Sequence, residues 1–200
     1  ADRLARKESP NDIPGLCYIS ELPEKEDHML PSFSEVKKDK KSFIQMFQLF
    51  YQNQDPFRGK VLAQQQDNRY LIQNPPPSPL SEKELDEIFE LDYEHAVHPF
   101  YRKWGVVKAL ETIKFSVTSH RGCFGECHFC AISVHQGKII QSRSEQSIIR
   151  EVKKYTKRED FKGYILDVGG PTANMYGMKC KSQLKKCHCL KKHCLFPSVC

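Results

Sequence analysis

The pattern of apolar and polar residues predicts a long helix in the first half of the chain. Four apolar side chains between residues 34 and 54 recur three or four positions apart and would bury one stripe of this helix. They are Phe43, Met46, Phe47 and Phe50. Asp55-Pro56 would end the helix, because the residue before a proline avoids the helical conformation. Such a stripe is typical of a packed core rather than of a cofactor site.

Two other segments of this half alternate as strands do. "GLCYIS" (15–20) predicts one strand, and "KVLAQQQDNRYLIQ" (60–73) predicts two strands around a turn at Asp67-Asn68. "NPPPSPLSEKE" (74–84) is rich in prolines, which cannot donate backbone hydrogen bonds, so it predicts an extended connector. At its end, the Ser-x-x-Glu spacing of a capping box, Ser81 to Glu84, predicts the start of a short helix.

The second half alternates strand and helix. "KFSVTS" (114–119) predicts a strand, and "GYILDVGG" (163–170) predicts an apolar strand that ends in two glycines. Between them, "SRSEQSIIREVKKY" (142–155) predicts a helix that begins with a capping box of Ser142 and Glu145. Strand, helix and strand in this order form a βαβ unit, which implies two parallel strands and an α/β fold.

The change of pattern also predicts the domain organisation. We place a boundary near residues 100–112, so that residues 1–110 are the mixed α/β end of an upstream domain plus a linker. Residues 111–200 then begin a second domain. No apolar run reaches the length of about 18 residues that a membrane span needs, and no signal peptide is visible, so we expect a cytoplasmic protein. The first residues, "ADRLARKESP", include no initiator Met, and we expect the chain to start inside a longer protein.

The cysteines are many and clustered. Of the nine, Cys17 stands alone, three lie in "RGCFGECHFC", and five crowd the last 21 residues. Clustering without a secretory signal favours metal binding over disulfides. The net charge of +6 is also local, because residues 168–200 hold six lysines and no Asp or Glu. A basic tail can attract nucleic acid, but this one has no Arg and few aromatic residues, so we favour a solvated lysine face.

The chemistry is concentrated in Cys123, Cys127 and Cys130, which are separated by three and two residues. A structural zinc site uses four ligands and a disulfide uses two, whereas three thiols suit a metal centre that keeps one coordination position open. Gly122 and Gly125 allow the loop to bend tightly. Two alternatives remain: a redox dithiol of the last two cysteines, or a zinc site that includes a histidine. The candidate histidines are His120, His128 and His135.

The location of this loop supports a catalytic interpretation. The cysteines follow the strand predicted at 114–119, and Gly169-Gly170 end the strand predicted at 163–170. In parallel α/β folds the chemistry lies at the carboxyl ends of the strands. We therefore expect the cysteine loop and the Gly-Gly turn to lie at the ends of adjacent strands.

The spacing Cys-x3-Cys-x2-Cys, with the aromatic Phe129 before the last cysteine, resembles the radical S-adenosylmethionine (SAM) superfamily. Four separated blocks, one of which contains these cysteines, occur in the order typical of its uncharacterised YgiQ-like branch, and the resemblance covers roughly residues 40–200. The blocks are "QNPPPSPLSEKELD", "HPFY", "HRGCFGECHFCAISVHQGKIIQSRSEQSI" and "DVGGPTANMYGMKC". The flanking "HQGKIIQSRS" makes the resemblance specific.

The resemblance implies an enzyme. Its three loop cysteines, Cys123, Cys127 and Cys130, would ligate a [4Fe–4S] cluster whose fourth iron binds SAM, and one electron would cleave SAM to methionine and a 5′-deoxyadenosyl radical that acts on an unknown substrate. An electron donor such as flavodoxin or ferredoxin is implied too. Phe129 would meet the adenine, and Gly169 and Gly170 would receive the SAM amino group. Because Pro171 stands where the superfamily usually has Glu, we expect this turn to act through its backbone.

The resemblance also implies that residues 111–200 are the truncated beginning of a partial (βα) barrel. A second metal site, iron–sulfur or zinc, is best matched by four cysteines of the tail, with unmetallated thiols as the alternative. They are Cys180, Cys189, Cys194 and Cys200. The competing hypothesis for function is a non-catalytic iron–sulfur or zinc module whose basic, cysteine-rich tail binds nucleic acid.

Overall fold

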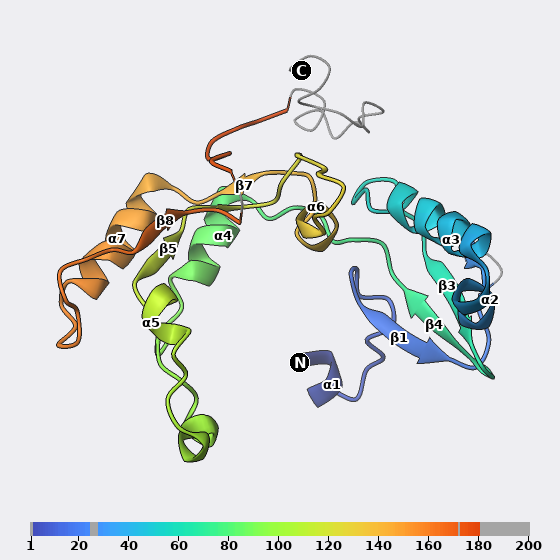
Figure 1. The fold of residues 1–200 in the computed structure, drawn as a ribbon, viewed down its shortest axis with the longest axis horizontal. Helices are drawn as coiled ribbons and strands as arrows, with labels where there is room; N and C mark the ends of the chain where they lie inside the picture. Colours follow the sequence, from blue (N-terminus) through green and yellow to red (C-terminus); the bar gives the residue numbers. More distant parts are fainter. Residues whose placement is uncertain (1, 25–27, 172, 181–200) are drawn as a thin grey trace. The chain divides into compact units, whose positions relative to one another are not determined.

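A computed structural model of the chain describes residues 2–24, 28–171 and 173–180 (Figure 1). The contacts between residues divide the described chain into two compact units, residues 2–79 and 80–180. Both units combine helices with strands, so the fold class is mixed α/β, as predicted. In the described part of the chain, no helix has the length and apolar character needed to cross a membrane.

The division between the units lies between Pro79 and Leu80, inside the predicted extended connector. Helix α4 (Glu82–Phe89) belongs to the second unit because it contacts strand β7 (Gln141–Ser142). The domain boundary that the sequence pattern places near residues 100–112 is a different division and stays a prediction.

The first unit is built on a four-stranded sheet with the order β1-β4-β3-β2. Its elements are α1 (Asp2–Ala5), β1 (Cys17–Ser20), β2 (His28–Leu30), α2 (Phe33–Lys38), α3 (Lys40–Gln52), β3 (Leu62–Gln66) and β4 (Arg69–Gln73). β4 pairs antiparallel with β1 and β3, and β2 runs parallel to β3. Leu62, Ala63 and Ile72 are buried on these strands. The strands predicted at 15–20 and 60–73 are thus confirmed.

The single helix predicted over 34–54 is wrong in one respect, because the structure divides it into α2 and α3. Asp39 between them has an extended backbone, with φ −127° and ψ 123°, and its carboxylate accepts the Ser42 N–H as the N-cap of α3. A side chain that caps a helix favours a break over continuation. The predicted buried stripe is also only partly covered, since Phe43 and Phe47 are 50% and 47% exposed.

The second unit contains the predicted βαβ arrangement. Its elements are α4, η1 (Pro99–Trp104), α5 (Leu110–Ile113), β5 (Ser116–Thr118), β6 (His120–Arg121), α6 (Ile132–His135), β7, α7 (Glu145–Tyr155) and β8 (Asp167–Gly169). β5 and β8 pair in parallel, and α7 lies between them in the chain. The core of this unit consists of Phe115, Val117 and Tyr155, against which Ile148 and Val152 of α7 pack. β6 and β7 form a separate antiparallel pair.

The two predicted capping boxes have different outcomes. Ser81 caps α4 in a full box with Glu84, as predicted. The box predicted at Ser142 is wrong, because α7 begins two residues later with Ser144 as its N-cap. The Ser142 hydroxyl is already occupied, since it accepts the backbone N–H of Gly177 at 2.9 Å.

Candidate metal centre

The cysteine loop and the Gly-Gly turn leave adjacent strands. In the parallel ladder Thr118 of β5 is the partner of Gly169 of β8. One residue further, the Ser119 N–H donates to the Gly169 carbonyl at 2.7 Å, so the pairing extends to the point where both strands end. Gly170 follows directly on one strand, and Cys123 lies four residues later on the other. This is the adjacency that the sequence pattern predicts.

The three cysteines differ in their surroundings. Cys123 is buried at 6% exposure, Cys127 is exposed, and Cys130 is half-buried and donates its N–H to the Cys127 carbonyl at 2.9 Å. A β-carbon on Gly125 would lie 3.4 Å from the Cys123 sulfur and 3.8 Å from the Cys127 sulfur, so these two sulfurs flank the glycine. In the part of the chain that the structure describes, no three Cys, His, Asp or Glu side chains meet closely enough to hold a metal ion.

A second segment, residues 136–140, holds the beginning of the cysteine loop. The Gly122 N–H donates to the side-chain oxygen of Gln136 at 3.1 Å, and the Cys123 N–H donates to the Gly137 carbonyl at 3.0 Å. The Gly125 N–H in turn donates to the Cys123 sulfur at 3.4 Å. The backbone amides around the first cysteine are therefore already satisfied by protein groups, which fixes its position.

Residues 136–140 also explain why position 122 is a glycine, and they supply the lysine that pairs with Glu126. Gly122 has φ +91°, and a β-carbon there would lie within 3.0 Å of the Ile139 carbonyl oxygen. Glu126, between the first two cysteines, also has a left-handed backbone, with φ +50°, and its carboxylate pairs with the Lys138 ammonium. The Glu126 side chain is only 7% exposed, so the ion pair is largely screened from water.

The following residues, "QSRS" (141–144), brace the ends of the strands. Arg143 donates its backbone N–H to the Ser119 carbonyl at 3.0 Å, and its own carbonyl accepts the Tyr176 hydroxyl at 2.8 Å. The Ser144 N–H donates to an Asp86 carboxylate oxygen at 2.9 Å, which ties α7 to α4. The local sequence pattern does not reveal these supporting roles. Their only signal was the specificity of the block "HQGKIIQSRS".

The Arg143 side chain lies at the centre of a buried network. Its guanidinium is fully buried, donates to Ser147 Oγ at 2.8 Å, and pairs with the Glu151 carboxylate. Its carbon Cζ lies 4.6 Å from the centre of the Phe89 ring. The other Glu151 oxygen accepts the Tyr155 hydroxyl at 2.6 Å. Burial raises the pKa of Tyr155 well above its usual range, and the Glu151 carboxylate raises it further.

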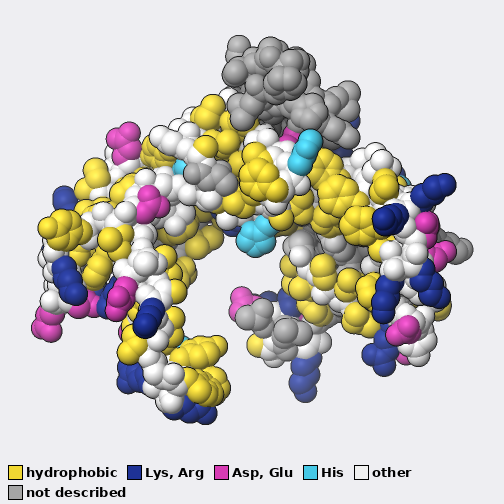
Figure 2. Space-filling view, viewed as in Figure 1, with side chains coloured by type: hydrophobic (Ala, Val, Ile, Leu, Met, Phe, Trp, Pro, Cys, Tyr) yellow, Lys and Arg dark blue, Asp and Glu magenta, His cyan; other side chains and the backbone are white. Residues whose placement is uncertain are grey.

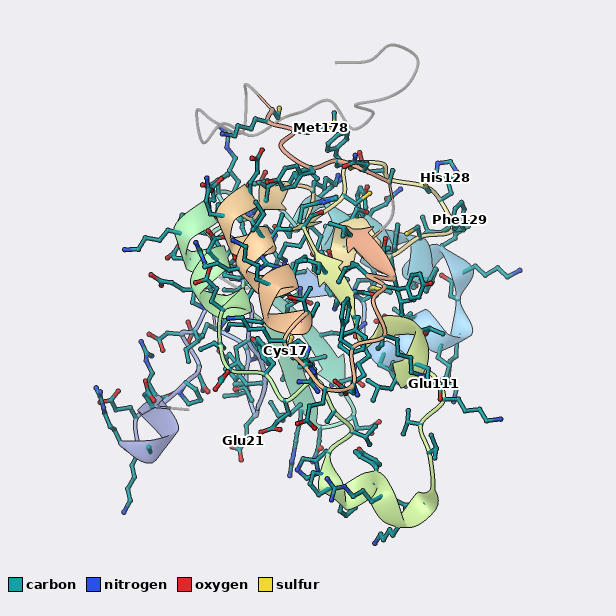
Figure 3. The ribbon with its side chains drawn as sticks, turned by 90° about the vertical axis from the view of Figure 1, so that its left-hand side faces the viewer. Cys17, Glu21, Glu111, His128, Phe129 and Met178 are labelled. Atoms are coloured by element: carbon teal, nitrogen blue, oxygen red, sulfur yellow. The ribbon has the colours of Figure 1, made fainter. Side chains whose placement is uncertain are left out.

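The three histidines considered as zinc ligands differ in burial. His120 is 1% exposed, and its Nδ1 lies 2.9 Å from Ser119 Oγ. His128 and His135 are exposed, and Figure 3 shows His128 directed outward from the loop. Among the described residues none of them completes a metal-binding group with the cysteines. The geometry therefore gives no support to the zinc alternative at this loop.

The residues predicted to meet SAM are only partly brought together. Gly169 and Gly170 lie half-buried beside Ser119 and His120. Phe129 is 93% exposed and projects outward next to His128 (Figure 3). Of the cysteines predicted for a second site, Cys180 is half-buried, and the others lie outside the described residues. Those others are Cys189, Cys194 and Cys200.

Comparison with known families identifies the class of protein. The family described as "Radical SAM N-terminal" matches residues 1–116, which is more than half of the chain. The chain belongs to this family. The match ends before Cys123, so it carries no information on the cysteine loop.

The chain is also similar to proteins named UPF0313. It is 50% identical over all 200 residues to a UPF0313 protein of Fusobacterium nucleatum, and these residues cover 35% of that protein. It is 48% identical over 191 residues, 94% of the chain, to one from Clostridium perfringens, and covers 29% of it. The chain thus spans about a third of the length of these relatives. No solved structure matches it.

Proposed function

We propose that this chain is the cluster-binding part of a radical SAM enzyme. The observation that carries the proposal is the adjacency of two segments. The three-cysteine loop and the Gly169-Gly170 turn follow two parallel strands that are paired up to their last residues. Ligands of α/β folds bind at this edge of the sheet. The cluster, SAM and the reaction belong to the same proposal.

The residues of the loop fit a [4Fe–4S] cluster. Cys123, Cys127 and Cys130 supply thiolates, the ligands that such clusters use, and leave one iron open. Gly125 leaves clear the space that a side chain would fill between two of the sulfurs. Arg121 Nε, two residues before the first cysteine, is buried without a hydrogen-bond partner among the described residues. A donor in this position suits an anionic group. When bound, the cluster and SAM supply the one-electron, reductive cleavage that starts radical chemistry.

The chain's own residues would bind and orient SAM. The Gly169 carbonyl already accepts the Ser119 N–H, and a carbonyl oxygen has a second lone pair for the amino group of a ligand. Pro171 offers no N–H, so at this position the turn has only a carbonyl for a ligand. Phe129 is fully available to stack on the adenine, because its ring contacts solvent.

We further propose that β5, α7 and β8 begin a partial (βα) barrel that the rest of a longer protein completes. Apolar side chains around β8 are exposed, as expected of a face that further elements cover: Leu166 is 51% and Val168 is 54% exposed. Figure 2 shows hydrophobic side chains on the surface of this unit. The substrate, an electron donor of the flavodoxin or ferredoxin type, and a cytoplasmic location are proposals for the whole protein.

The test is spectroscopic and anaerobic. The chain is reconstituted with iron and sulfide and reduced, and its electron paramagnetic resonance spectrum is recorded with and without SAM. A [4Fe–4S]⁺ signal that changes when SAM is added supports an open iron site. A zinc-containing, iron-free product, or a cluster signal indifferent to SAM, favours the non-catalytic metal-binding module. The ratio of iron and zinc to protein in the same sample tests the second site, because one cluster per chain and no zinc contradicts it.

A further inference from the structure

The imidazole of His120 fills the space beside the Cα atom of Gly170. A β-carbon on Gly170 would lie within 3.0 Å of three atoms of this ring, Nε2, Cε1 and Cδ2. The contact is therefore possible only because residue 170 is a glycine. We propose that His120 is a positioning residue that sets the Gly169-Gly170 turn against the cysteine loop so that one SAM molecule can reach both. This inference rests on the proposed function.

His120 is held on both ring nitrogens. It is 1% exposed, and its Nε2 accepts the backbone N–H of Met175 at 3.4 Å. Because a backbone N–H can only donate, Nε2 carries no proton, and the proton lies on Nδ1. Nδ1 then donates to Ser119 Oγ at 2.9 Å. The network thus assigns a neutral imidazole in a single tautomer and a single orientation.

Residues 119–120 connect the cysteine loop to three other parts of the second unit, namely β7, the Gly169-Gly170 turn and Met175. His120 pairs with Ser142 in the antiparallel β6–β7 ladder, and it lies three residues before Cys123. Its neighbour Ser119 is bonded to Gly169, and its Nε2 is bonded to Met175, which is itself 5% exposed. A displacement of the ring should therefore shift the turn relative to the loop.

This position has a consequence for binding. A ligand held by two groups loses affinity when the distance between the groups is no longer fixed. Removing the ring should leave the cysteines able to hold a cluster, because Gly122 and Cys123 are held by residues 136–137. It should weaken SAM binding, because the turn loses the packed ring beneath it.

The experiment compares four variants of the full chain with the wild type. They are His120→Ala, Gly170→Ala, the double variant, and His120→Gln. Iron content and the [4Fe–4S]⁺ signal without SAM report the cluster, and a titration of that signal with SAM reports affinity. Exchange of the Gly170 and Met175 amide hydrogens in the iron-free chain reports the packing without any ligand. His98→Asn is the control, because His98 is exposed and asparagine also caps a helix.

We expect His120→Ala to keep its iron. The SAM concentration at the midpoint of the titration should rise about tenfold or more, which corresponds to about 1.4 kcal/mol of binding free energy. Gly170→Ala should bind SAM as poorly, because its methyl group meets the ring. In the double variant the methyl group has room, so the two losses should not add, and SAM affinity should equal that of His120→Ala. In His120→Gln the side-chain oxygen can accept the Met175 N–H, so protection of that amide should return.

The outcomes separate the two proposals. The positioning role is overturned if His120→Ala loses iron content and SAM affinity together. It is also overturned if Gly170→Ala binds SAM with wild-type affinity. Wild-type exchange of both amides in His120→Ala overturns it as well, whether or not SAM binds. A different pair of results counts against the proposed function. In it, the cluster signal of the wild type does not change when SAM is added, while amide exchange still responds to His120→Ala as expected.

Discussion

The guanidinium of Arg143 donates a 2.9 Å hydrogen bond to the carbonyl of Thr118, the last residue of β5. The two residues are 25 positions apart, and the bond joins the strand that leads into the cysteine loop to the segment that begins α7. The guanidinium is fully buried and also bonds Ser147 and Glu151. A charged network of this kind is stable only when every donor has a partner, so it specifies one arrangement of these segments.

Arg143→Lys should therefore destabilise the second unit strongly. Lysine keeps the charge but cannot reach Thr118, Ser147 and Glu151 at once, because its three donors sit on one nitrogen. We expect the free energy of unfolding to fall by about 1–3 kcal/mol, the cost of leaving a buried hydrogen-bonding group without its partner. Urea unfolding followed by circular dichroism measures it.

The matched control is Arg150→Lys on the same helix, whose ion pair with Glu90 is solvent-exposed, at 52% for the arginine side chain. An exposed pair contributes about 0–1 kcal/mol, so this variant should unfold close to the wild type. Equal losses in the two variants would contradict the structural role assigned to Arg143.

Gly122→Ala should disrupt the cysteine loop for a steric reason. Alanine at φ +91° costs about 1–2 kcal/mol, and its methyl group would also meet the Ile139 carbonyl, which adds about 1–3 kcal/mol of overpacking. Gly137→Ala is the control, because it has a similar φ, +84°, but open space where the methyl group would go. Urea unfolding and iron incorporation should both be impaired more in Gly122→Ala. If the two variants behave alike, the close approach to Ile139 has no consequence for the loop.

The local elements could be predicted from the sequence because short-range chemistry specifies them. The alternation around Asp67-Asn68 specifies the β3–β4 hairpin, and Ser81 with Glu84 specifies the start of α4. The start of α7 could not be predicted in the same way, because Ser142 with Glu145 fits the capping-box pattern, whereas the actual N-cap, Ser144, has no Glu or Gln three positions on. The Gly177 N–H, 35 residues away, occupies Ser142 and leaves the capping role to Ser144.

The candidate site shows the same limit. Periodicity places the cysteines and Gly169-Gly170 at the ends of adjacent strands, because the strand order of a βαβ unit follows from its sequence. The burial of His120 could not be predicted. It depends on Gly170 and Met175, which approach only after the chain has folded, and a lone histidine near cysteines equally suggests a ligand. The roles of Gln136 and Lys138 depend on long-range contacts as well.

The cysteine loop gives a prediction for the metal. Cys123→Ala, Cys127→Ala and Cys130→Ala should each lose most of the reconstituted cluster, because two thiolates do not hold it, and 5′-deoxyadenosine formation should fall to background. Cys17→Ala is the control of the same residue type, since Cys17 is an exposed thiol on β1. Iron content and product analysis measure both effects. Retention of 5′-deoxyadenosine formation in any of the three loop variants would overturn the assignment of that cysteine.

Tyr155 leads to a prediction for how the free energy of unfolding depends on pH. Burial, together with the Glu151 carboxylate, raises the pKa of its hydroxyl in the folded state above the ordinary value of about 10. The neutral hydroxyl is favoured by folding, so its contribution to stability is fully present below pH of about 10 and is lost as the pH rises through the folded pKa. The free energy of unfolding of the wild type should therefore decline in this alkaline range.

Tyr155→Phe tests this sign. The variant loses the hydrogen bond that the hydroxyl donates to Glu151 at 2.6 Å, for which the Ser116 carbonyl at 3.3 Å is the alternative acceptor, so it should be less stable at neutral pH by about 1–2 kcal/mol. Above pH of about 10 its free energy of unfolding should decline less steeply than that of the wild type, because no buried hydroxyl remains to ionise. Tyr164→Phe is the control, since Tyr164 is 75% exposed and should leave both the stability and its alkaline slope unchanged. Parallel alkaline slopes for Tyr155→Phe and the wild type would show that this hydroxyl does not govern the decline.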